Sequence, residues 1–190
     1  MISKTVAAGR LKATSDAIEA VQNTDMTLIC VGTPSNEDGS LKLDYIRDVC
    51  RQVGVALAKK DGYHSVVLRS TVVPGTARNV AIPILAEASG KEPGVDFGFG
   101  NNPEFLREST AIYDYFNPPK IVIGAIDERT AKAVSALYKG IEAPEVVTEI
   151  EVAEGVKYAD NAWHAMKVGF ANAIGSMAKA LRLDGRRLMA

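Results

Sequence analysis

Three polar residues near the end of the chain are spaced so that one ligand could contact all of them. Lys157, Asn161 and His164 lie four and three residues apart. Side chains at this spacing share one face of an α-helix. The row combines one positive charge with two groups that form hydrogen bonds, so it predicts a ligand-binding face.

The helix that would carry this row is unusually long, from about Glu149 to Leu181. At 1.5 Å per residue it spans roughly 45–50 Å, which favours a spine between two domains. Apolar residues recur along its opposite face, and this pattern predicts a core-facing surface. They are Val152, Val156, Ala159, Trp163, Met166, Phe170, Ile174, Met177 and Leu181.

Three glycines interrupt this helix, at Gly155, Gly169 and Gly175. Each one costs a helix interior about 1 kcal/mol relative to alanine. Close packing against another element, or against a ligand, would explain their presence.

The composition favours a soluble globular protein without a nucleic-acid or membrane partner. The 190 residues are 47% hydrophobic and 24% charged, with a net charge of −1. The sequence contains no basic block, no apolar run of membrane-spanning length and no secretory signal. Cys30 and Cys50 lie 20 residues apart, which is neither a metal-site spacing nor a disulfide framework. We therefore expect a reducing cytoplasm.

Segments typical of strands and helices alternate along the chain. Strands are predicted over 11–14, 26–31, 65–68, 95–99, 120–123 and 146–147, and helices over 17–23, 43–60, 76–88, 105–114 and 128–139. Such alternation predicts an α/β fold with a mostly parallel sheet and helices on both faces.

Three polar loops follow predicted strands. They are Gly32-Thr33-Pro34, Ser70-Thr71 and Asn102-Pro103-Glu104. Ligands bind beyond the carboxyl ends of the strands in such sheets. Loops of this kind ordinarily contain Gly, Pro, Asn and Ser, so each loop alone is weak evidence. Together with the Lys157 row, they favour a nucleotide site.

Other signals expected of a nucleotide-binding domain or a hydrolase are missing. The sequence lacks the Gly-x-Gly-x-x-Gly turn that normally opens such a domain, and Gly98-Phe-Gly100 has no third glycine.

His64 precedes a predicted strand and is expected at the surface or an edge. Glu104 and Glu108 lie one helical turn apart and could pair, although acidic residues are also ordinary at helix starts.

Four segments resemble, in order, the UDP-glucose/GDP-mannose dehydrogenase family. They are VGTP at 31–34, RSTVVPGT at 69–76, NPEFLREST at 102–110 and KYADNAWHAMKVGFAN at 157–172. The resemblance extends from about Leu11 to the end of the chain. The Trp163-His164 pair is most similar to the members that act on GDP-mannose.

The resemblance implies the later part of a Rossmann-like, doubly wound parallel sheet followed by a long central α-helix. Residues 1–148 would form a partial NAD-binding domain. Residues 149–190 would form the central helix, which leads into a substrate domain and contributes to a homodimer. The family's glycine-rich turn and its Gly-Gly-x-Cys segment have no match here, and Cys30 and Cys50 do not replace the cysteine. The chain alone is therefore expected to be inactive and to bind NAD weakly.

The resemblance also implies catalytic roles for four residues. Lys157 and Asn161 would stabilise oxyanions that develop on the sugar carbon, a task suited to a lysine charge and an amide donor. Glu104, together with Thr71 and a water molecule, would support hydrolysis of a thioester as a general base.

Binding roles follow from the same matches. The residues implied to line NAD are Thr33, Pro34, Ser70, Thr71 and Glu108. Those implied to contact the nucleotide sugar are Phe105, Leu106, Arg107, Lys157, Asn161 and His164. No metal is expected.

The resemblance implies that the chain is part of an NAD-dependent 6-dehydrogenase acting on GDP-mannose. It would oxidise the C6 alcohol to a carboxylate with two NAD, giving GDP-mannuronate for an alginate-type polysaccharide in the cytoplasm. One alternative is part of a UDP-glucose 6-dehydrogenase. Another is a non-catalytic module that associates with itself through the apolar face of the long helix.

Overall fold

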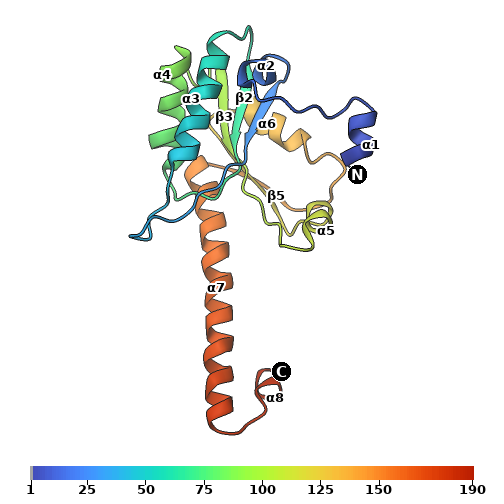
Figure 1. The fold of residues 1–190 in the computed structure, drawn as a ribbon, viewed down its shortest axis with the longest axis vertical. Helices are drawn as coiled ribbons and strands as arrows, with labels where there is room; N and C mark the ends of the chain where they lie inside the picture. Colours follow the sequence, from blue (N-terminus) through green and yellow to red (C-terminus); the bar gives the residue numbers. More distant parts are fainter. Residues whose placement is uncertain (1) are drawn as a thin grey trace.

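The computed structural model describes residues 2–190 and consists of one sheet with a long helix projecting from it (Figure 1). The five strands follow sequence order across the sheet. They are β1 (Met26–Ile29), β2 (His64–Leu68), β3 (Phe97–Asn101), β4 (Ile121–Ala125) and β5 (Glu145–Thr148). Every neighbouring pair is parallel except β3 and β4. The predicted α/β fold with a mostly parallel sheet is confirmed.

Most helices lie within a few residues of their predicted positions. They are α1 (Ile2–Ala7), α2 (Ala17–Gln22), α3 (Asp44–Ala58), the π-helical turn η1 (Ala77–Ala81), α4 (Ile82–Ser89), α5 (Ala111–Phe116), α6 (Glu128–Ala136), α7 (Ile150–Ala180) and α8 (Gly185–Met189). The predicted strand over 11–14 is wrong, because that segment has no regular structure. Within the described chain, no helix is both long and apolar enough to span a bilayer.

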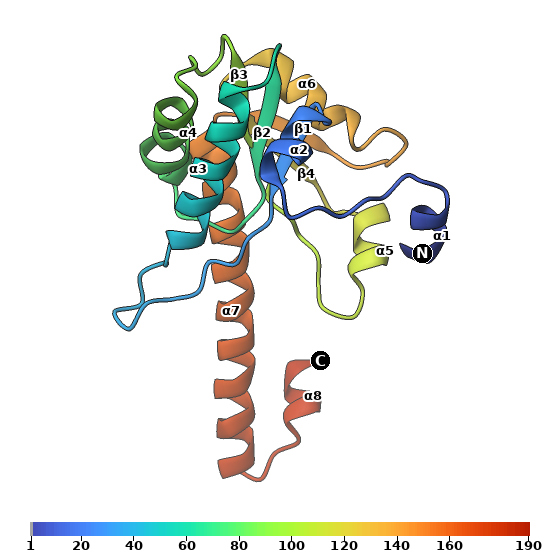
Figure 2. The same cartoon turned by 45° about the horizontal axis from the view of Figure 1, so that its top comes forward.

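Helices cover both faces of the sheet, as the alternating pattern predicts. Val66 and Leu68 of β2 belong to the core cluster that contains the buried residues of α3 and α4. Val67 packs instead with Val134 of α6. Successive side chains of a strand point to opposite faces, so β2 contributes to both cores. In Figure 2, α3 and α4 lie side by side, and α6 lies away from them across the sheet.

The first turns of α7 pack directly on β4. A Cβ added to Gly124 would lie 2.7 Å from the Ile150 Cα and 2.8 Å from the Ala153 Cβ. A glycine at this position therefore allows the helix backbone to approach the strand. Ile150, Ala153 and Lys157 are buried in this contact region.

Beyond Lys157 the helix is largely exposed, so the predicted core-facing stripe is wrong for these turns. Trp163, Met166 and Phe170 are 57%, 56% and 60% exposed. Helical periodicity identifies an apolar face but does not say which element covers it. Here α8 packs against the far end of α7 (Figure 1).

The glycines of α7 differ in their surroundings. A Cβ on Gly155 would lie 3.6 Å from Pro74, an ordinary van der Waals contact, so α7 packs on the loop after β2 there but this packing does not require a glycine. A Cβ on Gly169 or Gly175 would meet no described atom within 4 Å. The start of α8 nevertheless passes near Gly175, because a Cβ on Gly185 would lie 4.0 Å from the Gly175 Cα, whereas packing among the described residues does not account for Gly169.

His64 is fully buried, so its predicted place at the surface or an edge is wrong. β2 is an interior strand of the sheet, and its first residue is covered like the rest. His64 Nδ1 lies 3.0 Å from the Thr24 carbonyl oxygen, and Nε2 lies 2.9 Å from the Thr27 hydroxyl. A carbonyl only accepts, so Nδ1 donates to Thr24 and Nε2 accepts from Thr27. Burial lowers the pKa of His64 from 6.5 to about 4.

Stability is therefore expected to fall in mild acid. The unfolded chain binds a proton at His64 before the folded chain does, because the folded-state pKa is the lower one. Stability that is fully present above pH 6.5 is lost as the pH falls to about 4, by up to about 3 kcal/mol. Urea unfolding at a series of pH values measures this loss. His64→Gln should flatten the curve between these pH values, whereas His164→Gln, at an exposed position, should not. An unchanged slope in His64→Gln would contradict the assignment.

Candidate active site

The loops after β1 and β2 are joined by two hydroxyl groups. The Ser70 hydroxyl donates to the Val31 carbonyl at 2.6 Å. The Thr33 hydroxyl donates to the Thr71 carbonyl at 2.9 Å. Parallel neighbouring strands end at the same edge of a sheet, so these loops meet there. Four of the five residues predicted to line NAD lie in these two loops.

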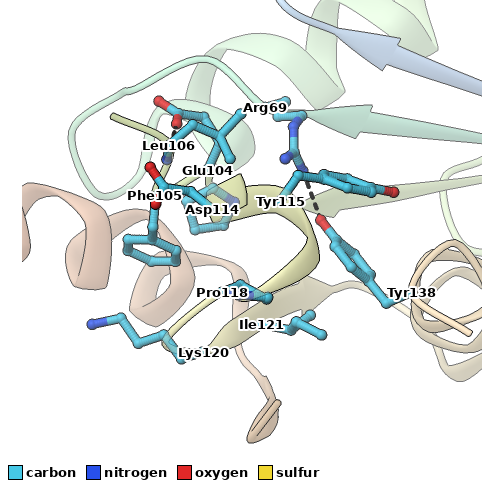
Figure 3. Close-up of a pocket in the computed structure, with 11 residues that line it drawn as sticks. Arg69, Glu104, Phe105, Leu106, Asp114, Tyr115, Pro118, Lys120, Ile121 and Tyr138 are labelled. Carbon is cyan, nitrogen blue, oxygen red and sulfur yellow. Dashed lines mark hydrogen bonds between the residues drawn. The ribbon is translucent and has the colours of Figure 1, made fainter. Parts of the chain in front are cut away.

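The loop after β3 is fixed by a buried polar network. The Asn102 side-chain amide donates to the Val122 carbonyl at 2.8 Å. The Asn102 side-chain oxygen accepts from the Tyr138 hydroxyl at 2.6 Å and from Arg69. Arg69 also donates to the Tyr138 hydroxyl at 2.8 Å, the bond drawn in Figure 3. The network connects the end of β2, the loop after β3 and the residues after α6, and it fixes the backbone that leads into Glu104.

Lys157 contacts the same loop from α7. Its Nζ lies 3.5 Å from Glu104 Oε1, and the lysine side chain is only 10% exposed. The Phe105 ring centroid lies 5.4 Å from this ammonium and 4.8 Å from that of Lys120. Lys120 in turn pairs with Asp160 of α7 at 3.0 Å. A nearly buried cation therefore faces a carboxylate and an aromatic ring.

All six residues predicted to contact the nucleotide sugar line one cleft between α7 and the loop after β3. They are Phe105, Leu106, Arg107, Lys157, Asn161 and His164. The predicted one-sided row on the helix therefore faces a hollow surface that could receive a ligand. The exposed Trp163 and Lys167 extend the helical wall of this cleft.

A much smaller cavity lies beside Glu104 (Figure 3). Its volume is about 20 Å³, which is room for a single water molecule. Arg69, Asp114 and Tyr138 supply polar groups to its lining. Glu104 Oε2 accepts from the Leu106 amide at 2.7 Å, so the orientation of the carboxylate beside this cavity is fixed.

Asp114 organises the segment that was predicted to be a helix over 105–114. Its carboxylate accepts from the Arg107 backbone amide at 2.9 Å, from the Arg107 guanidinium at 2.7 Å and from the Thr110 hydroxyl at 2.8 Å. These bonds hold the pKa of Asp114 well below its usual range, chiefly through the Arg107 side chain. They also satisfy the loop without helical bonds, so the helix begins only at Ala111.

Glu108 does not take the position expected from helical spacing. It lies exposed in the turn over 108–110, whereas Thr33 and Ser70 lie in the loops after β1 and β2. Glu104 pairs with Lys157 instead of with Glu108. The pairing that helical spacing would allow is not seen, because no helix connects the two glutamates.

Sequence reasoning missed several residues of this region. Asp114, Lys120 and Tyr138 join the site only through tertiary contacts, and no local spacing indicates them. Glu154 was also missed, although its spacing could have indicated it. It lies three residues before Lys157 in the same helix, and side chains at this spacing are neighbours.

Two family models match the chain. The NAD binding domain of the UDP-glucose/GDP-mannose dehydrogenase family matches residues 1–142, and the central domain of this family matches residues 151–190. A GDP-mannose 6-dehydrogenase of Pseudomonas syringae pv. tomato is 52% identical over 189 residues, covering 100% of this chain and 43% of the relative. A UDP-glucose 6-dehydrogenase of Haloferax volcanii is 39% identical, covering 96% of this chain and 44% of the relative.

Solved structures agree with this assignment. The chain superimposes on a ternary complex of GDP-mannose dehydrogenase from Pseudomonas aeruginosa with a TM-score of 0.97 and 51% identity, covering 99% of this chain and 43% of that one. For a UDP-glucose dehydrogenase from Pyrobaculum islandicum the TM-score is 0.92 and the identity 44%, with 98% and 43% covered. The chain thus spans less than half the length of these relatives. Because the first family model covers most of its residues, the chain belongs to the UDP-glucose/GDP-mannose dehydrogenase family.

Proposed function

We propose that this chain forms part of an NAD-dependent GDP-mannose 6-dehydrogenase. Residues 1–148 would supply part of the NAD-binding domain, and residues 149–190 the central helix. The observation that carries the proposal is the nearly buried Lys157, which lies beside Glu104 and lines the same cleft as Asn161 and His164. The higher identity to GDP-mannose enzymes than to UDP-glucose enzymes supports the choice of substrate. The product would be GDP-mannuronate, made in the cytoplasm for an alginate-type polysaccharide.

The strand ends fit the cofactor of the family. Thr33, Ser70 and Thr71 lie where ligands bind in doubly wound sheets, and Pro34 and Glu108 are proposed to complete this wall. Bound NAD would accept hydride from the sugar. The hydroxyls of Thr33 and Ser70 already fix the two loops through the Thr71 and Val31 carbonyls, so the loop backbone would not need to be ordered by the cofactor.

The residues in and beside the cleft would stabilise negative charge on the reacting oxygen, orient the sugar and activate a water molecule. The Lys157 ammonium and the Asn161 amide would donate to oxygen that becomes negative at the reacting carbon, as a preorganised oxyanion site does. Phe105, Leu106, Arg107 and His164 would orient the nucleotide sugar. The cavity beside Glu104 has room for the water that this carboxylate, with Thr71, would activate for hydrolysis.

The substrate is tested on the purified gene product that carries this chain. NADH formation at 340 nm should occur with GDP-mannose and yield two NADH per sugar oxidised, because the alcohol loses four electrons and each NAD accepts two. UDP-glucose is the matched comparison. Turnover of UDP-glucose in preference to GDP-mannose would replace the proposed substrate with the alternative one.

Loss of the Lys157 charge should abolish most turnover. In the same gene product, Lys157→Ala should lower kcat by about 100-fold or more, the scale for removing an oxyanion donor. Lys179→Ala removes an exposed lysine later on the same helix and should leave kcat unchanged. Equal activity of both variants would exclude the oxyanion role.

A second candidate is self-association through α7, and the exposed apolar residues of this helix favour it. A homodimer would cover Met166 and Phe170. The mass of the 20.3 kDa chain, measured by sedimentation at several concentrations, should approach twice this value. Phe170→Glu should shift the equilibrium toward monomer, whereas Val95→Glu, at an exposed position before β3, should not. A strict monomer at every concentration would rule this candidate out.

A further inference from the structure

Glu154 is a buried carboxylate that the proposed reaction does not use. It lies in the second turn of α7 and is only 1% exposed. Oε2 accepts from the Gly75 amide at 2.6 Å, and Oε1 accepts from the Ala77 amide at 2.7 Å. One side chain on α7 therefore binds two backbone amides, one in the loop after β2 and one at the first residue of η1.

The amides that Glu154 binds cannot easily find other partners. They lie at the start of η1, where the first amides of a helix have no carbonyl of their own helix to bind. Ala77 is fully buried. Burial raises the pKa of Glu154, and the two amide bonds oppose this effect. Protonation would turn one of the two oxygens into a hydroxyl, which is a much weaker acceptor, so the carboxylate is the form that suits both bonds.

The carboxylate connects two segments that carry proposed functional groups. Gly75 follows Thr71 by four residues, and Lys157 follows Glu154 by three. The other end of the Thr71 loop is already fixed by the hydroxyls of Ser70 and Thr33. Glu154 supplies the missing restraint on the side of the loop that faces α7.

A second, exposed link lies one turn earlier on α7. Glu151 pairs with Arg78, and the two side chains are 36% and 59% exposed. Exposed pairs of this kind contribute little to stability. The Glu151 pair joins the same two elements, so it is a matched control for Glu154.

We propose that Glu154 is a positioning residue, whose carboxylate fixes the Thr71 loop at a constant distance from Lys157. This inference rests on the proposed function, because that function assigns the Thr71 loop and Lys157 of α7 to one reaction. Glu154 touches neither substrate nor cofactor in this assignment. It acts by preventing the loop and the helix from sliding apart during turnover.

The first experiment does not depend on the reaction. Amide hydrogen exchange of the 190-residue chain is measured for the wild type, Glu154→Gln and Glu151→Gln. Glutamine has one acceptor oxygen instead of two, so Gly75 or Ala77 should exchange about tenfold faster or more, as expected for losing a bond to a charged group. Glu151→Gln should leave both amides protected. Unchanged protection of both amides in Glu154→Gln would overturn the proposal.

The second experiment separates positioning from simple folding. NADH formation from GDP-mannose is measured with the gene product and expressed per folded molecule. Glu154→Gln should lower kcat by about tenfold to a hundredfold, because misplacement by about 1 Å can cost that much. The KM values should stay within about twofold, and Glu151→Gln should match the wild type. An unchanged kcat per folded Glu154→Gln molecule would overturn the positioning role.

The two experiments fail in different ways. If the wild type oxidises no nucleotide sugar, the proposed function falls, and the catalytic part of this inference falls with it. Faster exchange at Gly75 or Ala77 in Glu154→Gln would then still support Glu154 as the restraint on the loop. If the wild type is active but exchange is unchanged, the function stands and the inference about Glu154 is wrong.

Discussion

The close contact between α7 and β4 at Gly124 is the constraint on which the rest of the site depends. A side chain at this position would overlap the backbone of Ile150, so only glycine lets the helix begin directly against the sheet. This contact sets the direction of α7 and buries its first turns. The positions of Glu154, Lys157 and every later residue of the helix follow from it, because a helix transmits its orientation along its length.

Polar groups then connect the separate loops into one site. Hydroxyl groups join the loops after β1 and β2, and the network of Arg69, Asn102 and Tyr138 fixes the loop after β3. Asp114 orders the segment that follows. These are side-chain bonds at buried or part-buried positions, where leaving a polar group unsatisfied is costly. The loops of the candidate site are therefore each restrained by side-chain hydrogen bonds, which is what a preorganised site requires.

The sequence predicted the regular elements better than the loops between them. Strand β4 is a continuous apolar run, β2 has one from Val66 to Leu68, and α3 has an apolar face at helical spacing, so local patterns are sufficient there. The predictions for His64 and for the segment over 105–114 were wrong because the environments of these residues depend on tertiary contacts. His64 is covered because its strand is interior, and the segment is held by the Asp114 carboxylate. The Lys157 row was visible because helical spacing is local. Its pairing with Glu104, 53 residues earlier, required the fold.

The exposed length of α7 has a mechanical consequence. One continuous helix carries Lys157 at its anchored end and apolar residues such as Phe170 and Met177 along its free part. From Lys157 to Ala180 it extends roughly 35 Å, so a tilt of about 5° at the base would displace the far end by about 3 Å while moving Lys157 very little. Any tilt of the helix would therefore pivot about its contact with Gly124. A partner bound to the distal turns would therefore fix the tilt of α7 relative to the sheet. A contact at this distance from the pivot restrains the tilt more strongly than an equal contact near the sheet.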